Sequence, residues 1–238
     1  MGTFEFGSVG TTRTGVPGAE WRRELVVSEK IAGIEIPDTR LAAEATALVL
    51  EAEPPLLFDH SRRVYLFAML QGLRRGLKPD PELLYVGAMF HDLGLTQTYR
   101  TSHQRFEIDG ANEARRFLTE HGVGADDVRR VWTAIALHTT PGVPEFMEPE
   151  IALVTAGVET DVLGIGRDDL DPAALEAVTD AHPRPDFKRR ILEAFADGFK
   201  DRPDTTFGTV NADVLAHFVP GFQRIDFVEV ILNSSWPE

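Results

Sequence analysis

The chain has 238 residues, with 24 Lys and Arg against 38 Asp and Glu, so its net charge near neutral pH is −14. This acidic balance argues against a nucleic-acid partner, because phosphate binding depends on clustered Lys and Arg. The absence of cysteine excludes disulfides and thiolate chemistry, so that any metal must be held by His and carboxylate side chains.

Length and hydropathy predict one soluble domain. A chain of this size can bury a single core, and its 43% hydrophobic content is ordinary for a soluble globule. No apolar stretch is long enough to span a bilayer, and the N-terminus lacks a basic, apolar signal region. We therefore expect a cytoplasmic protein with no membrane association.

Residues 1–27 are expected to form an N-terminal arm. The first 20 residues carry five Gly and show no apolar periodicity, which predicts a loose segment that packs on the body or on a second subunit. Such an arm is compatible with a homo-oligomer, and we assign no catalytic or binding role to the arm itself. The body then begins with an amphipathic helix for which Asp38 is the expected N-cap.

The next predicted helix carries a histidine on its buried face and ends near Gly76. One face holds residues at the i, i+4, i+8 and i+11 positions, namely Leu56, His60, Val64 and Phe67. Because its neighbours on that face are apolar, His60 should point into the core.

A third helix, over residues 82–92, ends in two adjacent side chains of the metal-binding type, His91 and Asp92. Pro81 marks its start and Gly94 its end. His91 shares the apolar face, and Asp92 leaves the apolar body at a slant. A carboxylate near a core needs a partner, because an isolated buried charge is costly, and a divalent cation is one such partner.

The polar stretch that follows leaves this helix directly and is well placed to wall a pocket. Within it we predict three substrate-binding residues, Tyr99, His103 and Glu107. For His103 and Glu107 a solvated surface position is an open alternative. Asp109 is the expected N-cap of the next helix, which ends at Gly122.

A further helix extends its apolar face to His138. As a core residue His138 would bond a backbone carbonyl, whereas beside a metal it would carry a proton or bind substrate. The helix over residues 150–163 has one face formed by Ile151, Val154, Val158 and Asp161. Three separate helices thus each offer a metal-type ligand from a buried face, as in helical-bundle metal sites.

Later segments add helices that start near Asp171-Pro172, Arg184-Pro185 and Asn211, the last being an expected cap. Strict apolar alternation over a sustained stretch is missing, so no sheet is predicted. The expected fold is all-α: one irregular helical domain over residues 28–222, with a C-terminal helical tail, residues 223–238, packed on it.

The order His60, His91-Asp92, Asp161 resembles the HD-domain superfamily of metal-dependent hydrolases, which bind a divalent cation with that set in an all-helical domain. The resemblance covers roughly residues 28–222. Several surrounding segments are similar to the cyanamide hydratase-like branch: Phe58-Asp-His60-Ser-Arg62, His91-Asp92-Leu-Gly94, Phe106-Glu-Ile-Asp-Gly110, Trp132-Thr-Ala-Ile-Ala-Leu-His138-Thr139 and Thr205-Thr-Phe-Gly208.

The resemblance implies one divalent metal ion, zinc or iron(II), held by His60, His91, Asp92 and Asp161. The residue types themselves suit manganese as well. It further implies a hydratase (lyase) in which Asp92 and His138 are catalytic. Water activated by the metal would add to a small nitrile-type substrate such as cyanamide and give urea.

Two other functions stay open at this point. One is a phosphohydrolase acting on a nucleotide or another phosphomonoester, as is common in the superfamily. Many such members place a Glu soon after His-Asp, whereas Leu93–Gln97 holds no carboxylate and the following loop offers Arg100 and Arg105 as phosphate clamps. The other is a non-catalytic metal-binding module.

Overall fold

The described chain opens with a small hairpin that the sequence analysis did not predict. In the computed structural model, which describes residues 29–100 and 102–236, β1 (Lys30–Ile31) pairs antiparallel with β2 (Ile34–Glu35). Ala32 and Gly33 form the turn at φ values of 51° and 79°. The expected N-terminal arm, residues 1–27, lies outside the described residues.

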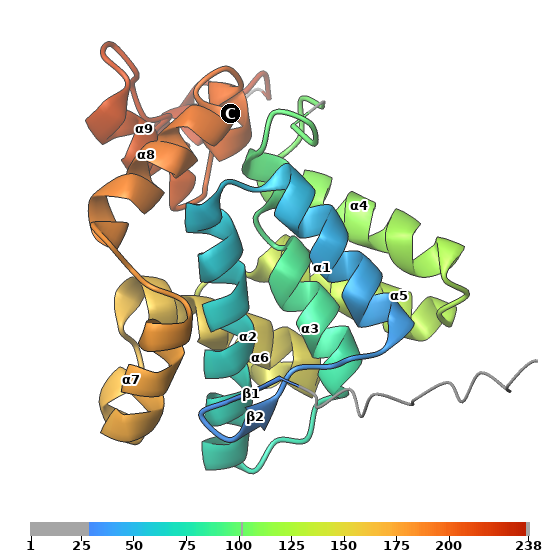
Figure 1. The fold of residues 1–238 in the computed structure, drawn as a ribbon. Helices are drawn as coiled ribbons and strands as arrows, with labels where there is room; N and C mark the ends of the chain where they lie inside the picture. Colours follow the sequence, from blue (N-terminus) through green and yellow to red (C-terminus); the bar gives the residue numbers. More distant parts are fainter. Residues whose placement is uncertain (1–28, 101, 237–238) are drawn as a thin grey trace, which may run out of the picture.

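Helices build the rest of the described chain, as the all-α prediction required (Figure 1). The α-helices are α1 (Arg40–Ala52), α2 (Pro55–Arg75), α3 (Pro81–Phe90), α4 (Phe106–Glu120), α5 (Ala125–Leu137), α6 (Pro149–Val158), α7 (Pro172–Ala181), α8 (Phe187–Phe199), α9 (Asn211–Phe218) and α10 (Phe227–Leu232). Short 3-10 turns are η1 (Leu93–Leu95), η2 (Pro144–Phe146), η4 (Arg167–Asp169) and η5 (Pro203–Thr206), and η3 (Glu159–Leu163) is a π-helix.

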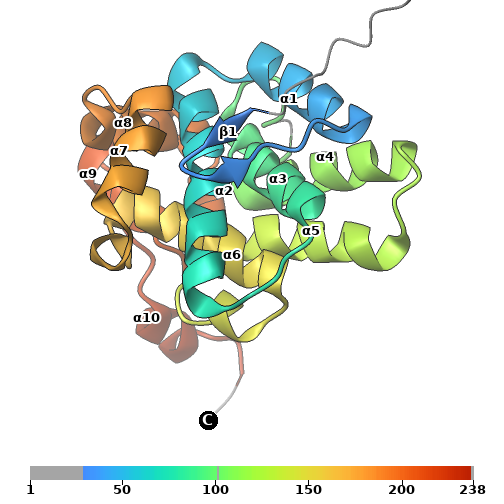
Figure 2. The same cartoon turned by 60° about the horizontal axis from the view of Figure 1, so that its bottom comes forward.

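Helix α2 runs through the middle of the molecule and packs along α6 and α3 (Figures 1 and 2). Its C-terminus is closed by Gly76 at φ 68°, as predicted, and α3 returns antiparallel from Asp80, whose carboxylate caps it. The first turns of α2 and the last turn of α3 therefore lie at the same end of the molecule. That end is covered by α8, which contacts both α2 and η1.

Two apolar clusters fill the interior. The larger cluster joins α1 to α6 and includes the apolar side chains of α3, which is buried from Leu83 to Phe90. A smaller cluster forms between the start of α2, η1 and the C-terminal helices; its buried members are Leu57, Leu95, Phe106, Phe187, Ile191, Phe199 and Leu215. This second cluster separates the α2–α3 end from solvent.

The three predicted N-caps are wrong. Helix α1 is capped by Thr39, whose hydroxyl accepts from the Ala42 N–H, and not by Asp38. Asp109 lies inside the first turn of α4, where its carboxylate pairs with the buried Arg202. Asn211 is the first residue of α9, and its side-chain amide donates to Glu107. At α1 the neighbouring Thr39 supplies the cap, and Asp109 and Asn211 bind other polar side chains instead of capping a helix.

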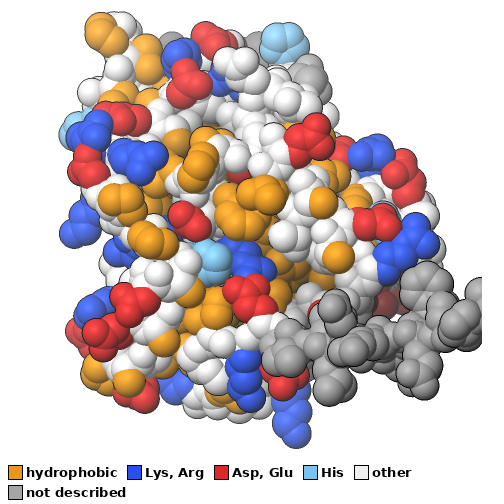
Figure 3. Space-filling view, viewed as in Figure 1, with side chains coloured by type: hydrophobic (Ala, Val, Ile, Leu, Met, Phe, Trp, Pro, Cys, Tyr) orange, Lys and Arg blue, Asp and Glu red, His pale blue; other side chains and the backbone are white. Residues whose placement is uncertain are grey.

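The surface of the described chain fits the acidic composition. On the face shown in Figure 3, Lys and Arg side chains are interspersed with Asp and Glu and do not gather into one basic patch. Among the described helices, none combines the length and the apolar character needed to cross a membrane.

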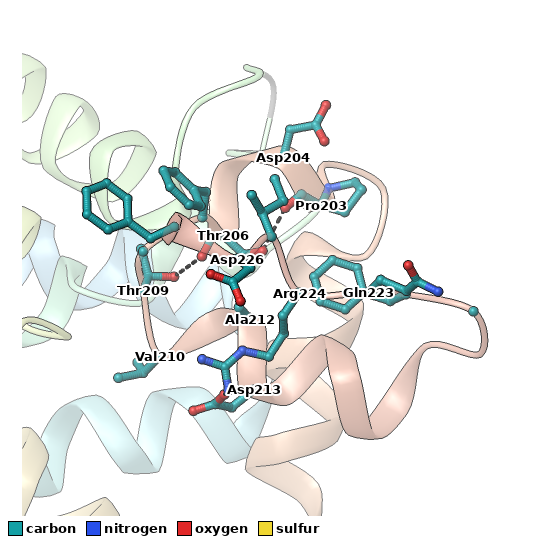
Figure 4. A pocket seen from close by; sticks show the side chains of 16 residues that line it. Pro203, Asp204, Thr206, Thr209, Val210, Ala212, Asp213, Gln223, Arg224 and Asp226 are labelled. Carbon is teal, nitrogen blue, oxygen red and sulfur yellow. Dashed lines mark hydrogen bonds and ion pairs between the residues drawn. The ribbon is translucent and has the colours of Figure 1, made fainter. Parts of the chain in front are cut away.

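The C-terminal tail differs from its expected packing. Helix α10 buries none of its residues and projects beyond the body (Figure 2), although residues 223–238 were expected to pack on the domain. Between this tail and the η5–α9 segment lies a cavity of about 1070 Å³ (Figure 4). None of the predicted site residues lines it.

The crossing of α2 and α6 depends on Gly157. A Cβ atom at this position would lie 2.3 Å from the Val64 carbonyl oxygen, and that backbone atom cannot rotate away. We expect Gly157→Ala to lower the free energy of unfolding by about 2 to 3 kcal/mol, measured by urea denaturation. The control is Gly124→Ala, whose Cβ would meet nothing within 4 Å. An equal effect of the two substitutions would contradict the close crossing.

Candidate metal centre

His60 occupies the second turn of α2 and is fully buried. Its Nδ1 lies 2.6 Å from Asp161 Oδ2, and its Nε2 lies 3.2 Å from His91 Nε2. The carboxylate can only accept, so Nδ1 carries the proton and Nε2 of the neutral ring is a bare acceptor. The second nitrogen of His60 is therefore directed at His91.

His91 and Asp92 follow Phe90, the last α-helical residue of α3, so the helix ends two residues earlier than predicted. His91 Nδ1 lies 2.7 Å from the Ala88 carbonyl oxygen, so this nitrogen donates and Nε2 faces His60. Asp92 leads into η1, where Gly94 passes α4 so closely that a Cβ atom would lie 2.0 Å from the Phe106 carbonyl oxygen. Glycine at this position lets the turn bring Asp92 back beside His91.

The spacing of the donor atoms fits one metal ion. Asp92 Oδ2 lies 3.4 Å from His91 Nε2 and 3.6 Å from His60 Nε2, and the two imidazole nitrogens are 3.2 Å apart. Two ligand atoms about 2.1 Å from a tetrahedral zinc ion would be about 3.4 Å apart. His60, His91 and Asp92 thus form a buried group whose ligand atoms lie within 4.8 Å of one another.

His138 adds a third imidazole beside this group. It follows α5, donates from Nδ1 to the Ile135 carbonyl oxygen at 2.7 Å, and holds Nε2 at 3.7 Å from Asp92 Oδ1. His138 Nε2 and both carboxylate oxygens of Asp92 are buried without a hydrogen-bond partner among the described residues. Buried acceptors that face one another in this way call for a cation, so the residues present fit a divalent metal.

Electrostatics within the group lead to the same conclusion. Burial alone would raise the pKa of Asp92, but the charge of the neighbouring His91 outweighs it and lowers that pKa to about 2. Burial would lower the pKa of His91, and the Asp92 carboxylate instead raises it. Burial and the neighbouring His91 lower the pKa of His138 to about 4, so this ring is neutral near pH 7. Asp92 is therefore the fixed negative charge of the site.

Asp161, predicted as a fourth ligand, lies on the Nδ1 side of His60. The π-helix η3 carries it, and its carboxylate receives Arg63 through Nε and Nη2, both at 2.9 Å. Arg184 forms a further ion pair with Asp161 at 2.9 Å. Burial would raise the pKa of Asp161, but the hydrogen bond from His60 and the charge of Arg63 lower it. In this arrangement Asp161 orients a ligand and stands outside the group of donor atoms.

The structure places the three predicted substrate-binding residues in different environments. Glu107 is fully buried, and its carboxylate accepts from Arg105 at 2.7 Å, from Asn211 at 3.2 Å and from Thr139, the residue after His138. His103 is exposed, and Tyr99 packs on the larger core cluster. Of the three, Glu107 alone lies beside the site, and the sequence analysis did not identify Thr139 or Asn211 as its partners.

Aromatic side chains cover the metal centre. The Phe187 ring lies 5.4 Å from the His60 ring, and the Phe106 ring lies 5.6 Å from the His138 ring. Phe199 stacks on Phe106 at 5.9 Å, which extends the cover toward α8. The exposed fractions of His60, His91 and Asp92 are 0%, so this cover shields the site from solvent.

Comparison with known families agrees with this geometry. Residues 57–177, just over half of the chain, match the family model described as HD domain. The chain therefore belongs to the HD-domain family of metal-dependent hydrolases, and the matched residues include His60, His91, Asp92 and Asp161. No curated protein matches the chain.

Substitution of Asp161 tests whether this residue binds the metal directly or only orients His60. Loss of a hydrogen-bonding partner behind a metal ligand typically weakens metal affinity by about 10- to 100-fold. We expect Asp161→Asn to bind zinc more weakly by about that factor and still to reach one equivalent, whereas Asp92→Ala fails to retain zinc. Zinc titration with a competing chelator measures both variants. Equal loss in both would make Asp161 a direct ligand, as the sequence analysis predicted.

Proposed function

We propose that this protein is a metal-dependent hydratase that adds water to a small, uncharged, nitrile-type substrate such as cyanamide. The observation that carries the proposal is the combination of a buried His–His–Asp group with an aromatic roof formed by Phe106 and Phe187. Such a buried, aromatic-covered site favours a small neutral molecule over a large charged one, because a charge that enters it must be desolvated.

The pairing of the arginines near the metal centre supports the same substrate class. Among the described residues, Arg63 and Arg184 are paired with Asp161, Arg105 with Glu107, and Arg202 with Asp109. A phosphomonoester would have to draw an arginine away from one of these carboxylates to obtain a charged clamp. This disfavours the phosphohydrolase alternative at the present site.

Each residue of the site has a definite role in the proposed reaction. When bound, the metal supplies a Lewis acid and lowers the pKa of a water molecule. His138 holds a bare Nε2 next to Asp92 and accepts a hydrogen bond from the added water. Glu107 fixes Thr139, and through it the end of α5 that carries His138. Addition of water to a nitrile needs no leaving group, so no residue has to expel one.

A direct assay tests the proposed function. Zinc- or iron(II)-loaded protein should convert cyanamide to urea, and Asp92→Ala should form no urea, because the fixed charge of the metal group is lost. The same preparations are incubated with p-nitrophenyl phosphate and a panel of nucleotides. Phosphate release without urea formation would replace the hydratase by a phosphohydrolase. If neither urea nor phosphate forms at full metal content, the result would favour a non-catalytic metal-binding module.

Glu107 and His103 offer a matched pair of substitutions from the same polar stretch. Glu107→Gln removes a buried charge from the network behind His138, and we expect kcat for cyanamide to fall by about 10- to 100-fold. His103→Ala alters an exposed side chain and should leave kcat and KM unchanged. If His103→Ala proves as damaging as Glu107→Gln, the loop contacts substrate as the sequence analysis predicted.

A further inference from the structure

Helix α10 combines an apolar sequence with an exposed position. Five of its six residues are apolar, and none of the six is buried. Together with the residues that follow it, the helix carries large apolar side chains that are between 45% and 85% exposed, namely Phe227, Val228, Val230, Ile231, Leu232 and Trp236. A helix that is apolar on nearly every side is ordinarily buried, so this segment calls for a partner.

Polar contacts give α10 little support within its own copy. The Asp226 carboxylate accepts from the Val228 N–H at 2.8 Å, and the Asn233 amide donates to the Glu229 carboxylate at 3.1 Å. Isolated helices shorter than about 12 residues are only marginally stable in water, and α10 has six. A surface that covered its apolar side chains would therefore stabilise the helix.

The exposed apolar surface continues from α10 onto the η5–α9 segment of the body. The Phe227 ring lies 6.3 Å from the ring of Phe207 across the edge of the 1070 Å³ cavity. Phe207 and Val210 are themselves exposed and line that cavity (Figure 4). We call these two side chains and the six apolar side chains of the tail the tail surface.

The size of the tail surface matches a protein–protein interface. An aromatic side chain offers about 150 to 250 Å² and an aliphatic one somewhat less, so the tail surface presents on the order of 800 Å². The largest apolar patch on a typical monomer covers about 300 to 600 Å². A standard interface takes about 800 Å² from each partner, which is the area that the tail surface provides.

The charges of the tail indicate which partner it fits. From Ile225 to Trp236 the charged residues are Asp226 and Glu229, and there is no Lys or Arg. A helix that lies on an anionic membrane carries Lys and Arg on its polar face, and the net charge of −14 opposes such binding. An apolar surface needs no opposite charge on its partner, so the same surface on two copies is self-complementary about a two-fold axis.

We propose that the tail surface is a homodimer interface, in which α10 of each copy packs against α10 and the η5–α9 segment of a second copy. The exposed side chains of each tail are then covered by the other copy, and the cavity beneath α10 becomes part of the interface. The proposal is independent of the hydratase function, because the tail surface contains no residue of the metal centre.

A pair of leucines with the same exposure provides the test. Leu232 in α10 and Leu73 in the last turn of α2 are both 69% exposed, and Leu73 lies outside the tail surface. In sedimentation velocity the full wild-type chain should have twice the 26.4 kDa mass of one copy. Leu232→Glu should weaken the dimer by about 100-fold or more, since a symmetric dimer carries the change twice, and Leu73→Glu should leave it unchanged.

Salt provides a second, independent measurement on the wild type. Two copies that each carry a charge of −14 repel one another, whereas apolar contact needs no ion pairs. Raising the ionic strength from about 0.1 to 1 M shortens the screening length from about 10 to 3 Å, so the dissociation constant of the dimer should fall several-fold. A dimer that dissociates at high salt would be held by ion pairs and would contradict an apolar interface.

Hydrogen exchange of the wild type shows where the copies meet. The backbone amides of residues 227–232 should exchange rapidly in dilute protein and become protected as the concentration rises through the dissociation constant. This measurement locates the interface even if Leu232→Glu folds poorly.

Four results would overturn the proposal. The first is a wild type that stays monomeric at every concentration, and the second is a monomer with protected α10 amides, whose cover would belong to its own chain. The third is a dimer that Leu73→Glu disrupts and Leu232→Glu does not, which would place the interface elsewhere. The fourth is a monomer that floats with phosphatidylcholine vesicles, which would make the tail a membrane anchor.

Discussion

The metal centre depends on one repeated interaction, the donation of an imidazole Nδ1–H to a fixed acceptor. His60 donates to Asp161, His91 to the Ala88 carbonyl and His138 to the Ile135 carbonyl. Each bond fixes the tautomer and leaves Nε2 bare on the side that faces Asp92. For two of the three rings the acceptor lies in the preceding helical turn, so a helix that ends at the histidine already sets its orientation.

Charge pairing around this centre decides which charge stays unpaired beside the metal ligands. Asp161 is neutralised by Arg63 and Arg184 on the outer side of His60, so it orients the ring without adding unpaired charge to the site. Glu107 is bound by Arg105, Thr139 and Asn211 on the side of His138. The remaining fixed charge, on Asp92, lies where a divalent cation would bind. The rings of Phe187 and Phe106 cover the rest of the site.

Regular helical periodicity allowed a correct prediction of most of the fold. The end of α2 at Gly76, the start of α7 at Asp171-Pro172 and the inward direction of His60 and His91 follow from local geometry and apolar spacing. The caps failed at Asp109 and Asn211 because distant partners, Arg202 and Glu107, compete for these side chains. The apolar sequence of α10 predicts that the helix packs on the domain, whereas the helix projects from it.

The sequence by itself determined that the protein is helical and that His60 and His91 each lie on the apolar face of a helix, because these properties depend on residues a few positions apart. Only the tertiary structure decided that Asp161 stands behind His60, that His103 lies in solvent and that Glu53 is buried with no cationic partner in the described part of the chain. Those outcomes depend on contacts between segments distant in the chain, such as the 98 positions that separate Arg63 from Asp161. Side-chain periodicity carries no information about which distant group will satisfy a buried charge.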